Sequence, residues 1–165
     1  MSWSKTSKRV TRRTVLTGSA AFLAACGFKP VYGPGGRAEK LTGRIEVLPP
    51  SDEEGRALSQ RLEERLGLPQ SPDLTLGADI FISEEQLGVL PDGSISRYNV
   101  IGRVDWTLLR GTETVLSGSE QSFTAYSANS TAVATIVAQR DARRRLMILI
   151  ADRITADILA RADAI

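Results

Sequence analysis

The chain contains no histidine, a single cysteine and few aromatic residues: four Phe, two Trp and three Tyr. These absences exclude zinc fingers, histidine-ligated metal centres, Ser-His-Asp triads and Cys-His pairs built within the chain. One cysteine also excludes an intrachain disulfide. The hydrophobic share of 42% beside 24% charged residues is typical of a globular protein and not of a disordered one. We therefore expect a folded protein without a metal ion or other cofactor.

Acidic residues are missing from the first 25 positions, whereas five basic residues lie there. These are Lys5, Lys8, Arg9, Arg12 and Arg13. Removing these five from the 21 basic residues of the chain leaves 16 against 19 acidic residues, a net charge of −3. The basic character of the whole chain thus belongs to its first segment. The mildly acidic remainder argues against nucleic acid as a partner.

Residues 1–25 are predicted to be an export signal. Their basic stretch leads into an apolar run over residues 15–25, well short of the roughly 20 residues that span a bilayer. A charged head, a short apolar core and small residues at its end together form a secretory signal peptide. The adjacent Arg12 and Arg13 are also typical of a twin-arginine signal, so the export route stays open.

The apolar run ends in Leu23-Ala24-Ala25-Cys26-Gly27, which resembles the bacterial lipobox. In that motif a small residue precedes the cysteine that receives diacylglycerol, so we expect cleavage before Cys26 and lipidation of its thiol. Several acyl chains are needed for a stable anchor, because each buried CH₂ contributes only ~0.8 kcal/mol. Gly27 in place of an Asp favours the outer membrane, with the protein lipid-anchored on the periplasmic face.

The mature chain divides into a tether and one domain. Residues 26–43 are rich in Gly and Pro and are predicted to form a flexible, lipidated tether. Residues 44–165 have the length of a single domain, and they contain no visible internal repeat.

Within that domain, the periodicity of apolar residues predicts six elements. Alternation over 44–48 indicates a short strand that ends at Pro49-Pro50. A cap at residues 51–54 and leucines every fourth residue up to Gly67 indicate an amphipathic helix of about four turns. Three strands over 74–89, 95–109 and 114–125 follow, joined by tight turns at 91–93 and 110–113, and a long helix covers 132–162.

The order β-α-β-β-β-α predicts an α+β fold of two layers. Two amphipathic helices would bury their apolar stripes on one face of a four-stranded sheet, whose last three strands form an antiparallel meander. The direction in which the first strand pairs stays open.

The charged residues of this domain point to binding and not to catalysis. Neighbouring carboxylates at 53–54, 63–64 and 84–85 point in different directions on a helix or a strand, so they cannot converge on one substrate atom. We therefore expect no enzymatic activity. The charge-dense segment 140–145 has two readings, a solvated helix face or a basic contact surface for an anionic partner.

Taken together, these residues resemble a known family. The junction Leu23-Ala24-Ala25-Cys26-Gly27-Phe28-Lys29-Pro30-Val31-Tyr32-Gly33 is similar to that of the alphaproteobacterial lipopolysaccharide-assembly lipoproteins, the LptE family. Weaker similarities continue through Arg56–Leu66, Pro91–Arg97, Phe123–Ser127, Asp141-Ala142 and Arg145-Leu146. The resemblance covers essentially the whole chain, although each later motif alone is unspecific.

The resemblance implies a function in the outer membrane. It implies that the domain sits inside the lipopolysaccharide-transport β-barrel from the periplasmic side, as plug and assembly factor, and that it contacts lipopolysaccharide. Arg97 and Arg110 lie near the expected strand ends, where a guanidinium could meet a lipopolysaccharide phosphate or a barrel carboxylate. The alternative is an accessory lipoprotein of an inner-membrane ABC-type transporter or lipid-trafficking complex.

Overall fold

The computed structural model describes residues 36–48, 50–89, 95–128 and 131–165. The elements in chain order are α2 (Arg37–Leu41), β1 (Ile45–Leu48), α3 (Glu53–Leu66), β2 (Leu74–Val89), β3 (Ile95–Arg110), β4 (Glu113–Ser127), α4 (Ala132–Ala160) and the 3₁₀ turn η1 (Ala162–Ala164). The expected signal peptide, Cys26 and the turn at 91–93 lie outside the described residues. Within the described residues, no helix is long and apolar enough to cross a membrane.

The four strands form one mixed sheet in the order β1-β2-β3-β4. β1 runs parallel to β2, and Ile45 lies opposite Leu74, whereas β2, β3 and β4 pair antiparallel. The predicted meander is therefore confirmed, and the open question of the first strand is answered in favour of parallel pairing. The second turn is tight because Gly111 adopts a positive φ of 60°.

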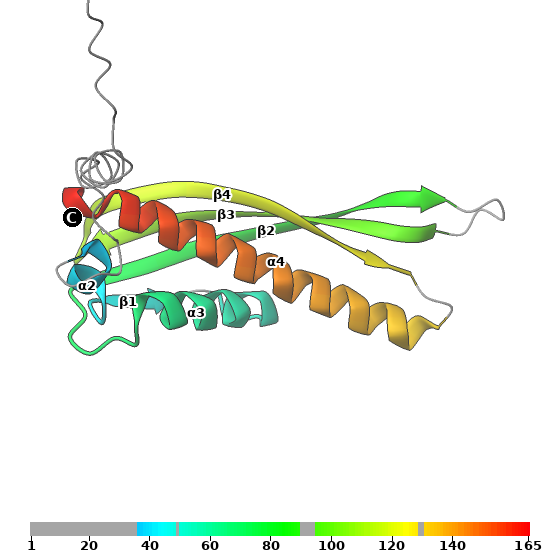
Figure 1. Ribbon diagram of the computed structural model, residues 1–165, viewed down its shortest axis with the longest axis horizontal. Helices are drawn as coiled ribbons and strands as arrows, with labels where there is room; N and C mark the ends of the chain where they lie inside the picture. Colours follow the sequence, from blue (N-terminus) through cyan, green and yellow to red (C-terminus); the bar gives the residue numbers. More distant parts are fainter. Residues whose placement is uncertain (1–35, 49, 90–94, 129–130) are drawn as a thin grey trace, which may run out of the picture.

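Both long helices lie on the same face of the sheet (Figure 1), so the α+β sandwich expected from the sequence is confirmed. α4 runs along the sheet, whereas α3 covers only the half of it near α2, η1 and the C-terminus. We call this half the proximal half. The other half, where β2 and β3 extend beyond α3 and α4 begins, is the distal half.

Local signals in the sequence explain where the helices begin and end. The Asp52 carboxylate caps α3 by accepting a hydrogen bond from the amide of Gly55 at 2.6 Å. Gly67, with a φ of 85°, ends that helix. The hydroxyl of Thr131 caps α4 in the same way, accepting from the amide of Ala134 at 3.3 Å.

The core is concentrated in the proximal half. α3 contributes Leu58, Leu62 and Leu66, which are the leucines of its predicted stripe, and all three are buried. They meet the apolar stripe of α4, whose buried side chains begin only at Ala142. On the sheet, buried positions alternate along β3 at Val100, Val104, Trp106 and Leu108.

The structure differs from the sequence prediction at the end of the expected tether. Within the segment 26–43, residues Arg37–Leu41 form the helix α2. Ala38 and Leu41 of this helix are buried in the main core, with 8% and 2% of their surface exposed. The Gly and Pro residues around them concealed this short apolar contact, because two residues are too few to show a helical period.

Candidate functional site

The two arginines predicted to bind phosphate lie near opposite ends of β3. Arg97 follows the start of the strand by two residues, and Arg110 ends it. Thirteen residues of strand separate them by about 43 Å, at roughly 3.3 Å per residue. The structure therefore places both near strand ends, as expected, but does not bring them together.

Their surroundings also differ. Arg97 is exposed, and no described residue forms a hydrogen bond or ion pair with its side chain. Arg110 donates a hydrogen bond to the backbone oxygen of Ile165 at 2.6 Å. Arg97 is consequently the freer of the two cations.

A polar cluster around Glu84 connects the elements of the distal half. This carboxylate points inward from β2 and accepts hydrogen bonds from three side chains on two other elements. The Tyr126 hydroxyl of β4 donates at 3.0 Å, Gln139 of α4 at 2.9 Å, and Arg143 of α4 at 2.8 Å. Arg143 also contacts the carboxylate of Glu54 on α3 at 3.2 Å. We call these five residues the Glu84 cluster.

The cluster shifts the ionisation of its members. Burial alone would raise the pKa of Glu84, but the hydrogen bonds from Arg143, Gln139 and Tyr126 outweigh it and hold the pKa below its usual 4.5. Burial and the neighbouring Glu84 carboxylate raise the pKa of Tyr126 to about 12. The side-chain hydrogen bond with Glu84 raises the pKa of Arg143. At neutral pH Glu84 is therefore ionised and paired with the Arg143 guanidinium.

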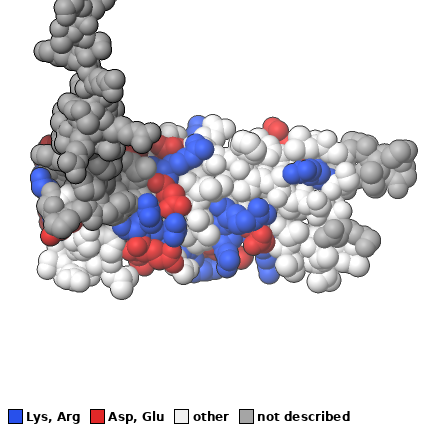
Figure 2. Space-filling model, viewed as in Figure 1, with Lys and Arg blue, Asp and Glu red and all other residues white. Residues whose placement is uncertain are grey.

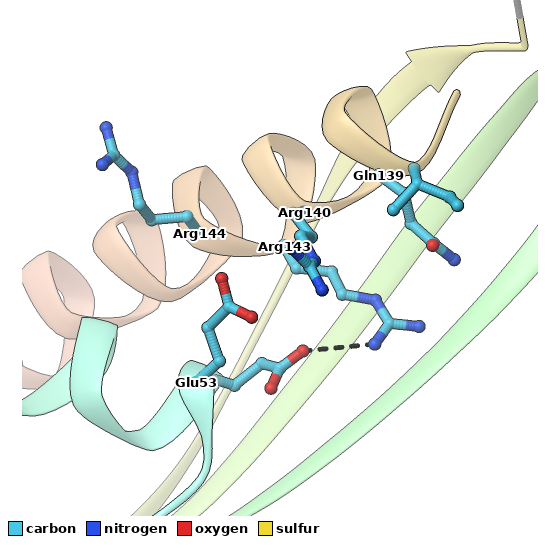
Figure 3. A pocket seen from close by; sticks show the side chains of 7 residues that line it. Glu53, Gln139, Arg140, Arg143 and Arg144 are labelled. Carbon is cyan, nitrogen blue, oxygen red and sulfur yellow. Dashed lines mark hydrogen bonds and ion pairs between the residues drawn. The ribbon is translucent and has the colours of Figure 1, made fainter. Parts of the chain in front are cut away.

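A hollow of about 330 Å³ opens between the start of α3 and the first half of α4, directly beside this cluster. It is lined by Glu53, Glu54, Ile136, Gln139, Arg140, Arg143 and Arg144. Figure 3 shows Arg143 turned towards the acidic side chains of α3, while Arg144 points out of the hollow. No described residue forms a hydrogen bond or ion pair with the side chain of Arg140 or of Arg144. The rim of the hollow therefore presents two unpaired guanidinium groups.

An exposed apolar surface lies next to this hollow. The first turns of α4 present Val133, Ile136 and Val137, which are 74%, 50% and 61% exposed. Figure 2 shows charged side chains of both signs gathered over the middle of the molecule, with a mostly uncharged surface towards the distal end. A contiguous apolar surface beside unpaired cations is typical of an interaction site.

The described residues offer no arrangement suited to metal binding. In these parts of the chain, no three Asp, Glu or Cys side chains gather around a point that could hold a metal ion. Of the neighbouring carboxylates, Glu84 and Glu85 separate as expected, since Glu84 is turned into the cluster and Glu85 is exposed. Glu53 and Glu54, in contrast, both line the hollow.

The Glu84 cluster was not predicted from the sequence. Glu84 occupies an inward position in the alternation of β2, two residues after Ile82, and a charged residue at such a position signals a buried ion pair. Its partner Arg143 could not be told apart from the other charged residues of the segment 140–145. Part of that segment, Arg143, is therefore structural, while Arg140 and Arg144 still fit a basic contact surface.

Comparison with known proteins agrees with this architecture. The family described as "LptE: Lipopolysaccharide-assembly" matches residues 42–158. No curated protein matches the chain.

Several solved structures share the fold. A candidate lipoprotein from Caulobacter crescentus CB15 is 26% identical, covers 74% of this chain and 93% of its own, and superposes with a TM-score of 0.62. The rare lipoprotein B from Shewanella oneidensis is 19% identical, with coverages of 70% and 93% and a TM-score of 0.55. A minor lipoprotein from Acinetobacter baumannii is 15% identical, with coverages of 73% and 94% and a TM-score of 0.57.

Proposed function

Because the chain belongs to the lipopolysaccharide-assembly family LptE, which matches it over residues 42–158, we propose that it is the lipoprotein partner of the lipopolysaccharide-transport β-barrel. A role in lipopolysaccharide assembly follows from the family. The finer proposal is that the domain enters the barrel from the periplasmic side, plugs its lumen and assists its assembly. The match of family and fold over most of the folded domain is the observation that carries this proposal.

The surface of the domain suits a plug better than a catalyst. The interior of a membrane barrel is polar, so a plug must present polar side chains to it. The outer face of the sheet does so at Asp79, Glu85 and Asn99, and the rim of the hollow adds Arg140 and Arg144. We propose that the protein acts by binding alone, without an enzymatic step.

Lipidation of Cys26 would place the domain at its site of action. The relatives from Caulobacter, Shewanella and Acinetobacter are named as lipoproteins, which supports the interpretation of residues 23–27 as a lipobox. A Cys26→Ala variant should lose incorporation of radiolabelled palmitate and should move from the outer-membrane fraction to other fractions. Palmitate labelling that survives this substitution would contradict lipidation at Cys26.

Arg97 and Arg110 are proposed as contacts for phosphate groups of lipopolysaccharide or for carboxylates of the barrel. Since about 43 Å of strand separates them, each would bind a different group. Arg97→Glu should weaken lipopolysaccharide binding in vitro more than Arg110→Glu, because Arg110 already binds Ile165. The Lys40→Glu/Arg56→Glu variant makes the same change in charge as the double variant, at exposed positions of α2 and α3, and is the matched control. Unchanged binding by the Arg97→Glu/Arg110→Glu variant would overturn the phosphate contacts.

The barrel partnership is tested by affinity purification from detergent-solubilised outer membrane, using a C-terminal tag. A large β-barrel protein in roughly equal molar amount is the expected result. An inner-membrane transporter in its place would contradict the proposal and support the accessory-lipoprotein alternative. Depletion of the protein should also lower the amount of heat-modifiable barrel, and a normal barrel after depletion would argue against the assembly role.

A further inference from the structure

The two edges of the sheet differ in whether side chains bind their backbone groups. At the β4 edge, Arg145 and Arg153 of α4 and Arg161, which follows its last residue, donate hydrogen bonds to backbone carbonyls of the strand. Arg145 reaches Ala125 at 3.4 Å, Arg153 reaches Gln121 at 2.9 Å, and Arg161 reaches Ser117 at 3.0 Å. These side chains thus occupy carbonyls with which another strand would pair. We call these three residues the arginine ladder.

The spacing of the ladder follows from the geometry of its two elements. The arginines are eight residues apart on a helix, which is about 12 Å of rise. The carbonyls are four residues apart on a strand, which is about 13 Å. Because the two lengths agree, each arginine meets its carbonyl, and the β4 edge is covered at regular intervals.

Among the described residues, nothing pairs with the opposite edge of the sheet over most of its length. β1 pairs with β2 only from Leu74 to Gly77. After Leu48 the sequence continues with Pro49 and Pro50, which have no amide hydrogen and cannot extend the pairing. The pairing of β2 with β3 is regular up to Gln86 and becomes irregular after it. Between Ala78 and Gln86, the backbone of β2 forms hydrogen bonds with no described residues other than those of β3.

The open segment carries unneutralised negative charge on its outer face. Asp79 and Glu85 are exposed, and no described residue forms an ion pair or hydrogen bond with either side chain. Asp79 lies opposite Asp105 of β3, so its nearest cross-strand neighbour is another carboxylate. Arg103 does not neutralise Asp79, because it binds Asp105 at 3.1 Å and lies over the Phe81 ring at 4.7 Å.

We propose that the β2 edge between Ala78 and Gln86 binds an extended segment of a partner protein that carries Lys or Arg, which adds to the sheet as a fifth strand. The backbone of β2 supplies the hydrogen bonds, and Asp79 and Glu85 select for basic residues at the facing positions. Half-exposed Phe81 lies between them and favours an apolar residue there. This inference goes beyond the proposed function, because it assigns a binding site on β2 for a basic extended segment. It does not depend on which protein supplies that segment.

The same charges disfavour a second copy of this chain as the occupant. If two β2 strands paired antiparallel around Ile82, Asp79 of one copy would lie opposite Glu85 of the other. Like charges directly opposite each other destabilise a sheet. The β2 edge therefore favours pairing with a basic strand and disfavours pairing with the β2 edge of a second copy. Charged side chains on edge strands are one way in which proteins prevent edge-to-edge aggregation.

The test is amide hydrogen exchange, measured by mass spectrometry on the full-length protein in detergent. The probes are two acetylated and amidated heptapeptides at millimolar concentration, Lys-Thr-Val-Ile-Val-Thr-Lys and the same peptide with Glu at both ends. The basic peptide should protect amides of residues 78–86 and should bind roughly tenfold more tightly than the acidic one. In the Asp79→Lys/Glu85→Lys variant this preference should reverse. The Glu113→Lys/Ser117→Lys/Ser127→Lys variant makes the same change in net charge on β4 and should keep it.

Three results would overturn the inference. The first is no protection of residues 78–86 with either peptide, and the second is equal protection with both, which would remove the charge selection. The third is protection that rises with protein concentration without any peptide, which would identify a second copy as the occupant. Circular dichroism of both variants establishes that they are folded, so that a lost preference reports on the edge.

Discussion

At the scale of single residues, Glu84 holds the distal half together. Its carboxylate accepts hydrogen bonds from β4 and α4, and through Arg143 it is linked to Glu54 of α3. Only 20% of the Glu84 side chain is exposed, so these charge-assisted bonds are shielded from water more than surface ion pairs are. Without the carboxylate, Arg143 would lose one of its two acidic partners.

Replacement of Glu84 should therefore destabilise the protein. We expect Glu84→Gln to lower the free energy of unfolding at neutral pH by about 1.5–3 kcal/mol, the range for hydrogen bonds to charged groups. Urea unfolding followed by circular dichroism measures the change. Glu85→Gln, one position along the same strand and exposed, is the control and should change stability by less than about 0.5 kcal/mol.

The contribution of Glu84 should also depend on pH in a defined direction. Its pKa in the folded protein lies below the usual 4.5, so the charged form is favoured by folding. The stabilisation is then fully present above 4.5 and is lost as the pH falls through the lower folded value. The difference between the wild type and Glu84→Gln should shrink over this acidic range. A difference that grows on acidification would contradict the cluster as described.

At the scale of elements, the packing of α4 on the sheet depends on a glycine. A Cβ atom at Gly102 of β3 would lie 2.8 Å from Cδ2 of Leu146 and 3.3 Å from Cδ1 of Ile150. Both side chains are fully buried on α4 and cannot move aside freely. Gly102 thus allows the helix to approach the strand closely.

Gly102→Ala should force the helix and the strand apart. Overpacking of a well-packed core costs typically about 1–3 kcal/mol, so we expect a decrease of that size in the free energy of unfolding. Gly77→Ala on the neighbouring strand is the matched control, because the closest atom to its added Cβ is 4.0 Å away. Equal stability of the two variants in thermal unfolding would refute the close approach at Gly102.

Most elements could be predicted from the sequence because each carries a strong periodic signal. The leucines of α3 recur every fourth residue, and the three long strands alternate between turns that contain Gly. Interactions between distant residues could not be predicted in this way. The contact of Glu84 with Arg143 joins residues 59 positions apart, and the parallel pairing of β1 depends on where α3 returns the chain. The helix α2 was not predicted, because its five residues show no periodicity of apolar side chains.

The arginine ladder leads to a further prediction at this scale. The variant Arg145→Ala/Arg153→Ala uncovers the carbonyls of Ala125 and Gln121 at the β4 edge. An uncovered edge is a template for another strand, so this variant should self-associate at concentrations at which the wild type does not. Sedimentation velocity measures this. Arg140→Ala/Arg144→Ala removes the same charge from the same helix and should leave the sedimentation unchanged.

At the scale of the whole molecule, the two halves differ in how much apolar surface they bury. In the proximal half, α2, α3 and α4 all pack on the sheet, whereas in the distal half α4 alone faces the long strands (Figure 1). The exposed Val133, Ile136 and Val137 belong to the distal half. A region with few buried apolar contacts opens at lower free energy than the rest of a fold.

We expect native-state hydrogen exchange to show this difference within one helix. Amides at 136–140 of α4 should exchange much faster than those at 150–158, where the side chains facing the core are fully buried. In the purified complex with the barrel, exchange in the first segment should slow. Uniform exchange along α4 in the protein alone would contradict a distinct distal half.

Eight residues of α4 span about the same length as four residues of β4, and this match has a consequence for the evolution of the chain. One residue inserted into α4 between Arg145 and Arg161 would displace the following arginine by about 1.5 Å and rotate it by about 100° around the helix axis. That arginine would then miss its carbonyl, and the apolar stripe behind it would leave the core. Insertions and deletions should therefore be eliminated by selection in this part of α4 and across from it in β4. Homologues should differ in length elsewhere, and above all in the connections between elements.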